Sequence, residues 1–123
     1  MLGTRGDVKL MDGTIGLHTK VSSRVSCVVD FYGPTNFLTM NKSAIKSATL
    51  DYNSVDPPES RLIGGPIQEN PEKVARANPI TYISWDDPSF LIIHGTQAPL
   101  VSFNQSELLH GALTSDGKSQ ARF

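Results

Sequence analysis

The sequence predicts an α/β fold in which a few parallel strands are connected by short crossover helices. Two apolar, β-rich runs, at residues 25–31 and 90–93, are separated by a long region with several helix-start signals. A short loop and a helical pattern follow the second run. Because strands joined by a long helical crossover pair in parallel, we expect the two runs to be neighbours in one sheet. The length favours a single domain over residues 1–123.

The first strand follows a segment without regular periodicity. Residues 1–23 are rich in Gly, Thr and Ser and carry a turn signal at Asp12-Gly13, which predicts an irregular N-terminal segment. The strand then runs from residue 24 to Phe31 and stops before Gly33-Pro34. Cys27 is the only cysteine, so it has no internal disulfide partner, and its apolar neighbours predict a buried side chain.

Residues 35–88 are expected to form an excursion of short helices between the strands. Proline and glycine punctuate the region, and each helix has a start or stop signal of known chemistry. The signals are a cap at Thr35 or Asn36, a capping box at Asp56-Pro57-Pro58-Glu59, a stop at Gly64-Gly65-Pro66, a second start at Asn70-Pro71-Glu72 and a stop at Asn78-Pro79.

Residues 89–115 are predicted to form a strand, a loop and a helix. The run Phe90–Ile93 lies between Pro88 and Gly95 and is typical of a strand buried on both faces. Ser102 and Gln105 have the spacing of a capping box, which leaves Ser106 on the helix surface. Parallel sheets bind ligands at the carboxyl ends of their strands, so the loop 95–101 is the expected functional edge. That loop contains no acidic residue.

Composition excludes several classes of function. The chain has 11 basic and 12 acidic residues, a net charge of −1 and no cationic run, which argues against nucleic acid or an anionic membrane as the principal partner. No segment has the length of a membrane span or a signal-peptide core, so a cytoplasmic location is expected. His18, His94 and His110 share no metal-ligand spacing, and we expect neither a metal nor a cofactor.

Three blocks of sequence resemble one enzyme family, in unbroken order. They are Val28-Val29-Asp30-Phe31-Tyr32-Gly33-Pro34-Thr35-Asn36-Phe37, the segment from Asn70 to Ser84, and Pro88-Ser89-Phe90-Leu91-Ile92-Ile93-His94-Gly95. The blocks resemble the α/β-hydrolase esterases and lipases, in particular the hormone-sensitive-lipase-like and acetyl-esterase-like branches. The resemblance implies serine acyl transfer on carboxylic esters and a partial α/β-hydrolase fold that covers the C-terminal half only. It also implies a pocket wall formed by Phe31, Tyr32, Pro34 and Phe37.

The same resemblance shows which catalytic positions this chain lacks. No G-x-S-x-G nucleophile motif occurs in the 123 residues, and Ala98 stands where the family has its catalytic aspartate. The catalytic histidine of the family follows the next strand, and this sequence stops at Phe123, about where that strand is expected. Normal triad catalysis by this chain alone is therefore not expected.

The remaining catalytic candidates are His94, His110 and Ser102, and each has an ordinary structural interpretation. His94 ends a strand and is typical of a half-buried, hydrogen-bonded histidine, whereas His110 and Ser102 fit a solvated helix position and a helix cap. An alternative function remains open: a non-catalytic module that oligomerises or binds a small ester or apolar ligand. Two strands leave two open sheet edges, which predicts a homo-oligomer.

Overall fold

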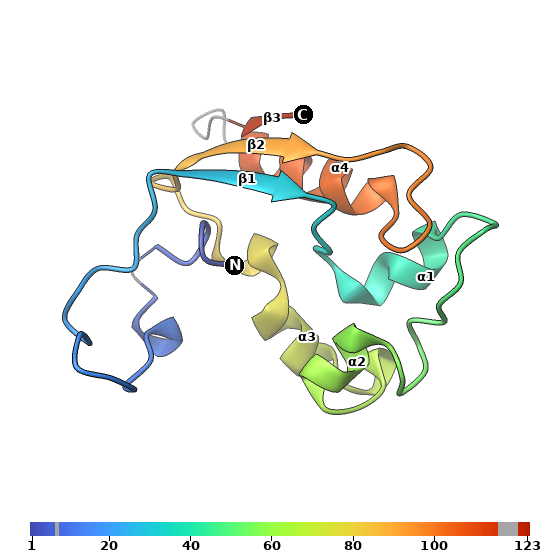
Figure 1. The fold of residues 1–123 in the computed structure, drawn as a ribbon, viewed down its shortest axis with the longest axis horizontal. Helices are drawn as coiled ribbons and strands as arrows, with labels where there is room; N and C mark the ends of the chain where they lie inside the picture. The colour runs from blue at the N-terminus through green and yellow to red at the C-terminus, as the bar shows by residue number, and fades with distance from the viewer. Residues whose placement is uncertain (7, 116–120) are drawn as a thin grey trace.

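The computed structural model, which describes residues 1–6, 8–115 and 121–123, has a small parallel sheet covered on one face by helices (Figure 1). The sheet contains β1 (Cys27–Phe31), β2 (Ser89–Ile93) and β3 (Ala121–Arg122) in the order β1-β2-β3. Both neighbouring pairs are parallel. The α/β fold class and the parallel pairing of the two main strands are thus confirmed, and the short β3 lies about where the resemblance placed the start of the next strand.

The strands are in continuous register over five residues. Cys27 pairs with Ser89 and Phe31 with Ile93, so the carboxyl ends of β1 and β2 lie at the same edge of the sheet. The connection between them holds short helices, as their proline and glycine signals predict. In chain order these are η2 (Phe37–Thr39), α1 (Met40–Ser43), α2 (Pro58–Ile63), η3 (Ile67–Glu69), α3 (Pro71–Ala77) and η4 (Pro79–Tyr82). The N-terminal segment contains the 3-10 turn η1 (Lys9–Met11).

Several helix-end predictions are confirmed by side-chain or backbone geometry. The Asn36 side chain accepts a hydrogen bond from the Leu38 N–H and so begins η2. Gly64 ends α2 with a left-handed backbone at φ 82°, and Pro71 occupies the first turn of α3. The capping box at Asp56 is wrong, because α2 begins one residue later behind Pro57 and has no side-chain cap. The extended Pro57 already directs the chain into the helix.

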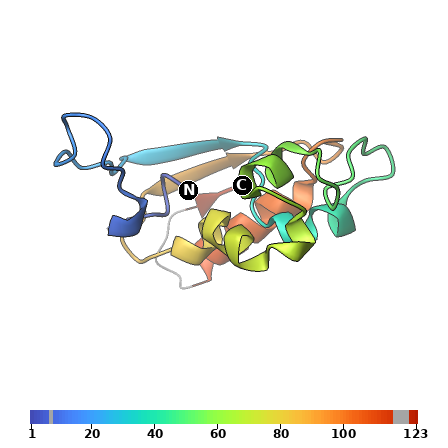
Figure 2. The same ribbon diagram turned by 90° about the horizontal axis from the view of Figure 1, so that it is seen from below.

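Two hydrophobic clusters stabilise the fold. One lies within the helical excursion and consists of Phe37, Met40, Tyr52, Ile63, Ile67 and Val74. The other joins Phe90 and Ile92 of β2 to Leu109 and Leu113 of α4 (Phe103–Thr114). Figure 2 shows the sheet as one layer with α1–α4 on the same side of it. In the described parts of the chain, no helix has the length and apolar character needed to cross a membrane.

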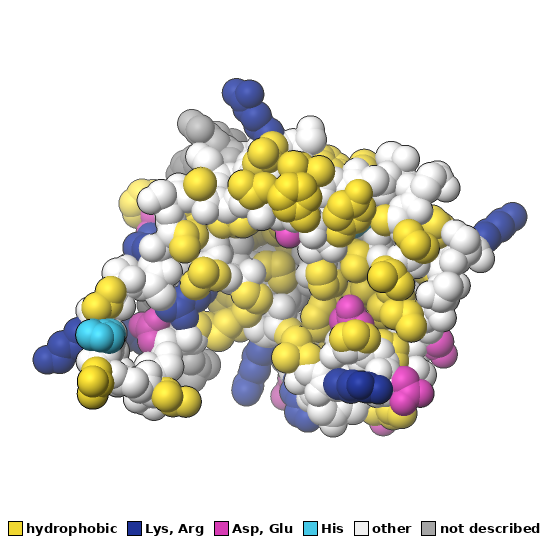
Figure 3. Space-filling view, viewed as in Figure 1, with side chains coloured by type: hydrophobic (Ala, Val, Ile, Leu, Met, Phe, Trp, Pro, Cys, Tyr) yellow, Lys and Arg dark blue, Asp and Glu magenta, His cyan; other side chains and the backbone are white. Residues whose placement is uncertain are grey.

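The opposite face of the sheet is apolar and uncovered by the described residues (Figure 3). Leu91 and Ile93 alternate with the buried Phe90 and Ile92, so the prediction that this strand is buried on both faces is wrong. Cys27 is also exposed, because its side chain points to this same face from the edge strand β1. An apolar run of four residues does not reveal whether helices cover one face of a strand or both.

Candidate functional site

The carboxyl edge of the sheet brings together the residues that follow β1 and β2. Tyr32 follows β1 and His94 follows β2, and the Tyr32 N–H donates to the Ile93 carbonyl at 3.1 Å. Their ring centroids are 4.7 Å apart with an interplanar angle of 53°. Tyr32 has a positive φ of 55°, a backbone conformation that side chains larger than glycine seldom adopt. Non-glycine residues in this conformation cluster at functional sites.

Both ring nitrogens of His94 are engaged. Nε2 lies 2.8 Å from the Val101 carbonyl, and Nδ1 lies 2.7 Å from the Ser106 hydroxyl. A carbonyl can only accept, so Nε2 carries a proton, and in the neutral ring Nδ1 accepts from Ser106. Ser106 is fully buried on α4, and its prediction as a helix-surface residue is therefore wrong. A serine in this position cannot be reached by a substrate.

These contacts close the loop that follows β2. His94 bridges to Val101 across the loop, the Ala98 N–H donates to the Gly95 carbonyl at 3.2 Å, and the Tyr52 hydroxyl donates to the Leu100 carbonyl. Hydrogen bonds within the loop, and one from Tyr52 in the helical excursion, therefore fix the conformation of the loop. Ala98 is half-buried within it and offers only a methyl group, which neither accepts nor donates a hydrogen bond.

The start of α4 differs from the predicted capping box. Ser102 occupies the N-cap position, but its side chain caps no helix N–H, and its hydroxyl lies 2.7 Å from the Ser43 hydroxyl. The Gln105 side chain instead reaches across to the turn after β1. Its carbonyl accepts from the Thr35 and Asn36 N–H groups at 3.0 and 2.7 Å. Ser102 and Gln105 therefore bond to residues distant in the sequence instead of forming a capping box. Their spacing in the sequence does not predict these partners.

A cavity of about 330 Å³ lies beside β1, between the sheet and the first residues of the chain. Asp30, Pro34 and Thr35 line it together with apolar side chains. One carboxylate oxygen of Asp30 and the Thr35 hydroxyl are buried without a hydrogen-bond partner among the described residues. Burial raises the pKa of Asp30 above its ordinary value, although a hydrogen bond from the Gly33 backbone opposes the shift.

The other predicted site residues are spread over the fold. Of the predicted pocket wall, Pro34 lines the cavity and Tyr32 contacts His94, whereas Phe31 is exposed on the open sheet face and Phe37 is buried in the helical cluster. His110 lies on α4 with its ring 5.6 Å from that of Phe123. The structure therefore does not bring Ser102 or His110 into a hydrogen-bonded pair with His94.

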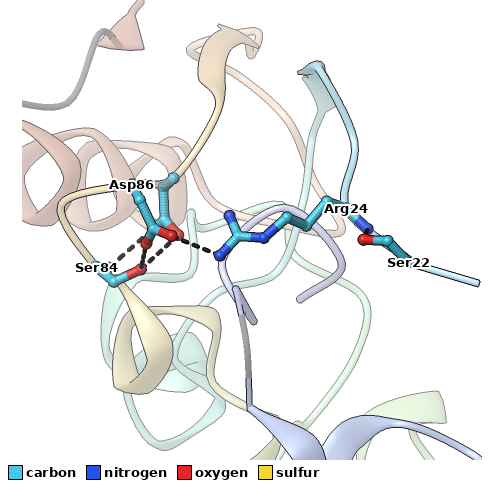
Figure 4. A network of polar contacts seen from close by, with 5 residues as sticks. Ser22, Arg24, Ser84 and Asp86 are labelled. Carbon is cyan, nitrogen blue, oxygen red and sulfur yellow. Dashed lines mark hydrogen bonds and ion pairs between the residues drawn. The ribbon is translucent and has the colours of Figure 1, made fainter. Parts of the chain in front are cut away.

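Charged residues gather at the opposite, amino edge of the sheet (Figure 4). The Ser84 hydroxyl donates to Asp86 at 2.8 Å and to Asp87 at 3.0 Å, and Arg24 forms an ion pair with Asp86. The hydrogen bond from Ser84, supported by Arg24, lowers the pKa of Asp86. These contacts tie the start of β1 to the segment before β2. The described residues contain no group of three metal-ligating side chains.

Comparison with known proteins identifies the family. The BD-FAE family profile matches residues 1–113. The chain belongs to the BD-FAE family. No curated protein matches this BD-FAE chain.

Two solved structures resemble this BD-FAE chain closely. A bifunctional GH43-CE protein of Bacteroides eggerthii is 36% identical with a TM-score of 0.76, over 89% of this chain and 14% of that protein. A truncated form of a carbohydrate esterase from gut microbiota is 31% identical with a TM-score of 0.77, over 90% of this chain and 37% of that protein. The BD-FAE chain thus has the fold of an esterase-type hydrolase domain and spans well under half of each of these proteins.

Proposed function

We propose that this chain forms the second half of a carboxylic ester hydrolase that acts on esters attached to carbohydrate. The observation that carries the proposal is the closed loop 94–101 at the carboxyl edge of the sheet, where the resembling esterases hold their catalytic acid. The two solved structures, described as carbohydrate esterases, support the carbohydrate substrate.

The chemistry of the complete reaction is serine acyl transfer. A serine attacks the ester carbonyl, a histidine transfers the proton, a carboxylate orients the histidine, and backbone amides stabilise the oxyanion. Ala98 removes the carboxylate from the loop, and the hydrogen bonds of His94 and Ser102 leave neither residue as an activated base or nucleophile. We therefore propose that this chain supplies sheet and pocket wall and does not hydrolyse esters by itself.

The first experiment measures the chain alone. We expect no labelling by a fluorophosphonate probe, and hydrolysis of 4-nitrophenyl acetate no faster than an equal concentration of free imidazole. Labelling that disappears on Ser102→Ala or Ser106→Ala would contradict the proposal, because it would identify a working nucleophile in this chain.

A second experiment places the loop in a complete enzyme. The matching segment of the gut-microbiota carbohydrate esterase is replaced by this chain, with either Ala98 or Ala98→Asp. We expect Ala98→Asp to raise kcat by about 10⁴-fold, because loss of the triad acid lowers kcat by about this factor in other serine hydrolases. Gln97→Asp is the matched control, because it adds the same charge one position away. Folded chimeras that show equal activity with Ala98 and with Asp at this position would refute the assignment.

A non-catalytic module that binds a small apolar ligand is the second candidate function. The cavity beside β1 favours it, because apolar walls there surround one Asp30 oxygen and the Thr35 hydroxyl, which have no hydrogen-bond partner among the described residues. Small-molecule sites commonly combine apolar walls with a few polar groups. Titration with ethyl acetate, followed by amide chemical shifts, tests this candidate. Shifts that saturate and are confined to residues around the cavity would favour binding over hydrolysis.

A further inference from the structure

Tyr32, the first residue after β1, is held in a backbone conformation that costs free energy. Its φ of 55° lies in the left-handed region, and it is the one non-glycine residue with a positive φ in the described part of the chain. In this region the Cβ of an L-residue crowds the following carbonyl oxygen. The Tyr32 N–H bonds to the Ile93 carbonyl at 3.1 Å, which ties the conformation to the end of β2. Such strained residues cluster at functional sites.

The ring of Tyr32 lies across the start of the loop that follows β2. Its centroid is 4.7 Å from that of His94, and a Cβ on Gly95 would lie 3.1 Å from the Tyr32 hydroxyl. The Gly95 carbonyl in turn accepts from the Ala98 N–H at 3.2 Å. Position 98 is where the resembling esterases hold their catalytic acid. The Tyr32 ring therefore lies beside the reaction centre of the proposed function.

Neither burial nor hydrogen bonding within the described residues accounts for this position of the ring. Tyr32 is 45% exposed. The hydroxyls of Tyr52 and Tyr82 each donate to a backbone carbonyl, whereas the Tyr32 hydroxyl has no hydrogen-bond partner in the part of the chain that the structure describes. A tyrosine that is packed for stability alone usually finds a partner for its hydroxyl. The strained residue thus presents a half-exposed ring and an unused hydroxyl at the carboxyl edge of the sheet.

We propose that Tyr32 contacts the sugar part of the ester substrate, an inference that rests on the proposed function. Parallel sheets bind ligands at the carboxyl ends of their strands. A phenol ring offers a flat apolar face and a hydroxyl at its edge. A sugar ring offers the complementary groups, a face of C–H bonds with hydroxyls around it. His94 cannot bond to the sugar in this way, because both of its ring nitrogens are engaged. Tyr32 therefore favours esters of sugars over esters of simple alcohols.

Kinetics on two esters test which part of the substrate Tyr32 contacts. The background is the chimera with the gut-microbiota carbohydrate esterase in which this chain carries Ala98→Asp. We expect Tyr32→Phe to lower kcat/KM about 3–10-fold for a monoacetylated methyl xyloside, mainly by raising KM, because one hydrogen bond to the sugar is lost. The loss should be clearly smaller for ethyl acetate, which contains no sugar. Tyr82→Phe is the matched control, since it also removes a tyrosine hydroxyl but should leave the ratio of the two kcat/KM values unchanged.

A double-mutant cycle tests the position of the ring. A methyl group added at Gly95 would approach the Tyr32 hydroxyl more closely than most Cβ contacts allow. Gly95→Ala should therefore displace the ring and lower kcat/KM for the sugar ester. The same substitution should cost less after Tyr32→Phe, because the crowded oxygen is gone. Gly111→Ala is the matched control, since an added methyl group there meets open space. An equal cost of Gly95→Ala in both backgrounds would contradict this placement of the ring.

Binding by the chain itself gives a readout that needs no hydrolysis. On titration with methyl xyloside we expect saturating amide chemical shifts at Tyr32, His94 and Gly95, and weaker binding after Tyr32→Phe. Equal losses of kcat/KM for the two esters, or saturating shifts that Tyr32→Phe leaves unchanged, would overturn the inference. If the chimera is inactive on both esters, the proposed function fails and the titration decides the sugar contact. Shifts that depend on Tyr32 then support the contact, and their absence overturns it.

Discussion

The carboxyl group of Asp30 couples the stability of this chain to pH. Burial is the largest cause of its raised pKa, and one of its oxygens has no hydrogen-bond partner among the described residues. A Cβ at Gly33 would lie 2.2 Å from an Asp30 oxygen, so a side chain there would force this carboxylate to move. The Gly33 N–H thus uses Asp30 as its acceptor, while burial disfavours the negative charge more than His94 and the N-terminal amine favour it.

Replacing Asp30 with asparagine should stabilise the chain in a pH-dependent way. A raised folded-state pKa gives stability that is fully present below the unfolded value of 3.8 and is lost as pH rises through the folded value. Asparagine keeps an acceptor for the Gly33 N–H without the charge. In urea titrations we expect Asp30→Asn to be more stable than the unmodified chain at pH 7 and nearly equal to it at pH 3.5. The exposed Asp56→Asn is the control, and a difference that is the same at both pH values would contradict this account.

Single residues also show which site features the sequence could predict. The position of His94 at the end of a strand, and the absence of an acid at Ala98, follow from local pattern and resemblance. The partners of Gln105 and Ser106 do not, because they come from segments about 70 and 12 residues away. Local spacing predicts a cap or a solvated helix position for such residues. Which contact forms depends on how α4 packs against the sheet.

At the scale of elements, three helix ends are predicted correctly because their chemistry is local. Gly64, Asn36 and Pro71 each act through backbone groups within a few residues, so their signals survive without knowledge of the tertiary fold. Burial of a strand, in contrast, depends on which distant segments pack against it. The same four apolar residues at 90–93 fit a strand covered on one face or on both, and only the packing of α4 decides which pair is buried.

Two glycines should respond oppositely to alanine because their backbones differ. Gly64 has φ 82° at the end of α2, whereas Gly111 lies inside α4, where an added methyl group would meet open space. We expect Gly64→Ala to lower the free energy of unfolding by about 1 kcal/mol and Gly111→Ala to raise it by about 1 kcal/mol. Urea denaturation measures both. A change of the same sign in the two variants would show that backbone conformation does not decide their effects.

At the scale of the whole molecule, the sheet has one face for its own core and one that the described residues leave open. Parallel sheets are normally covered on both faces. The open face explains why a confirmed α/β-hydrolase topology coexists with exposed large hydrophobic side chains. Apolar periodicity could not predict which face of the sheet is open, because the residues on the two faces of β2 are equally hydrophobic.

Adjacent substitutions in β2 should separate the two faces. Ile92 is 2% exposed and packs in the cluster with α4, whereas Leu91 lies on the open face. Ile92→Thr places a hydroxyl in an apolar cluster and removes buried methyl groups, which should cost about 2–4 kcal/mol of unfolding free energy. Leu91→Thr introduces a β-branched residue that suits a strand and should change it by less than about 1 kcal/mol, while reducing the binding of a hydrophobic dye. Equal destabilisation by the two variants would mean that another part of the protein covers Leu91 in solution.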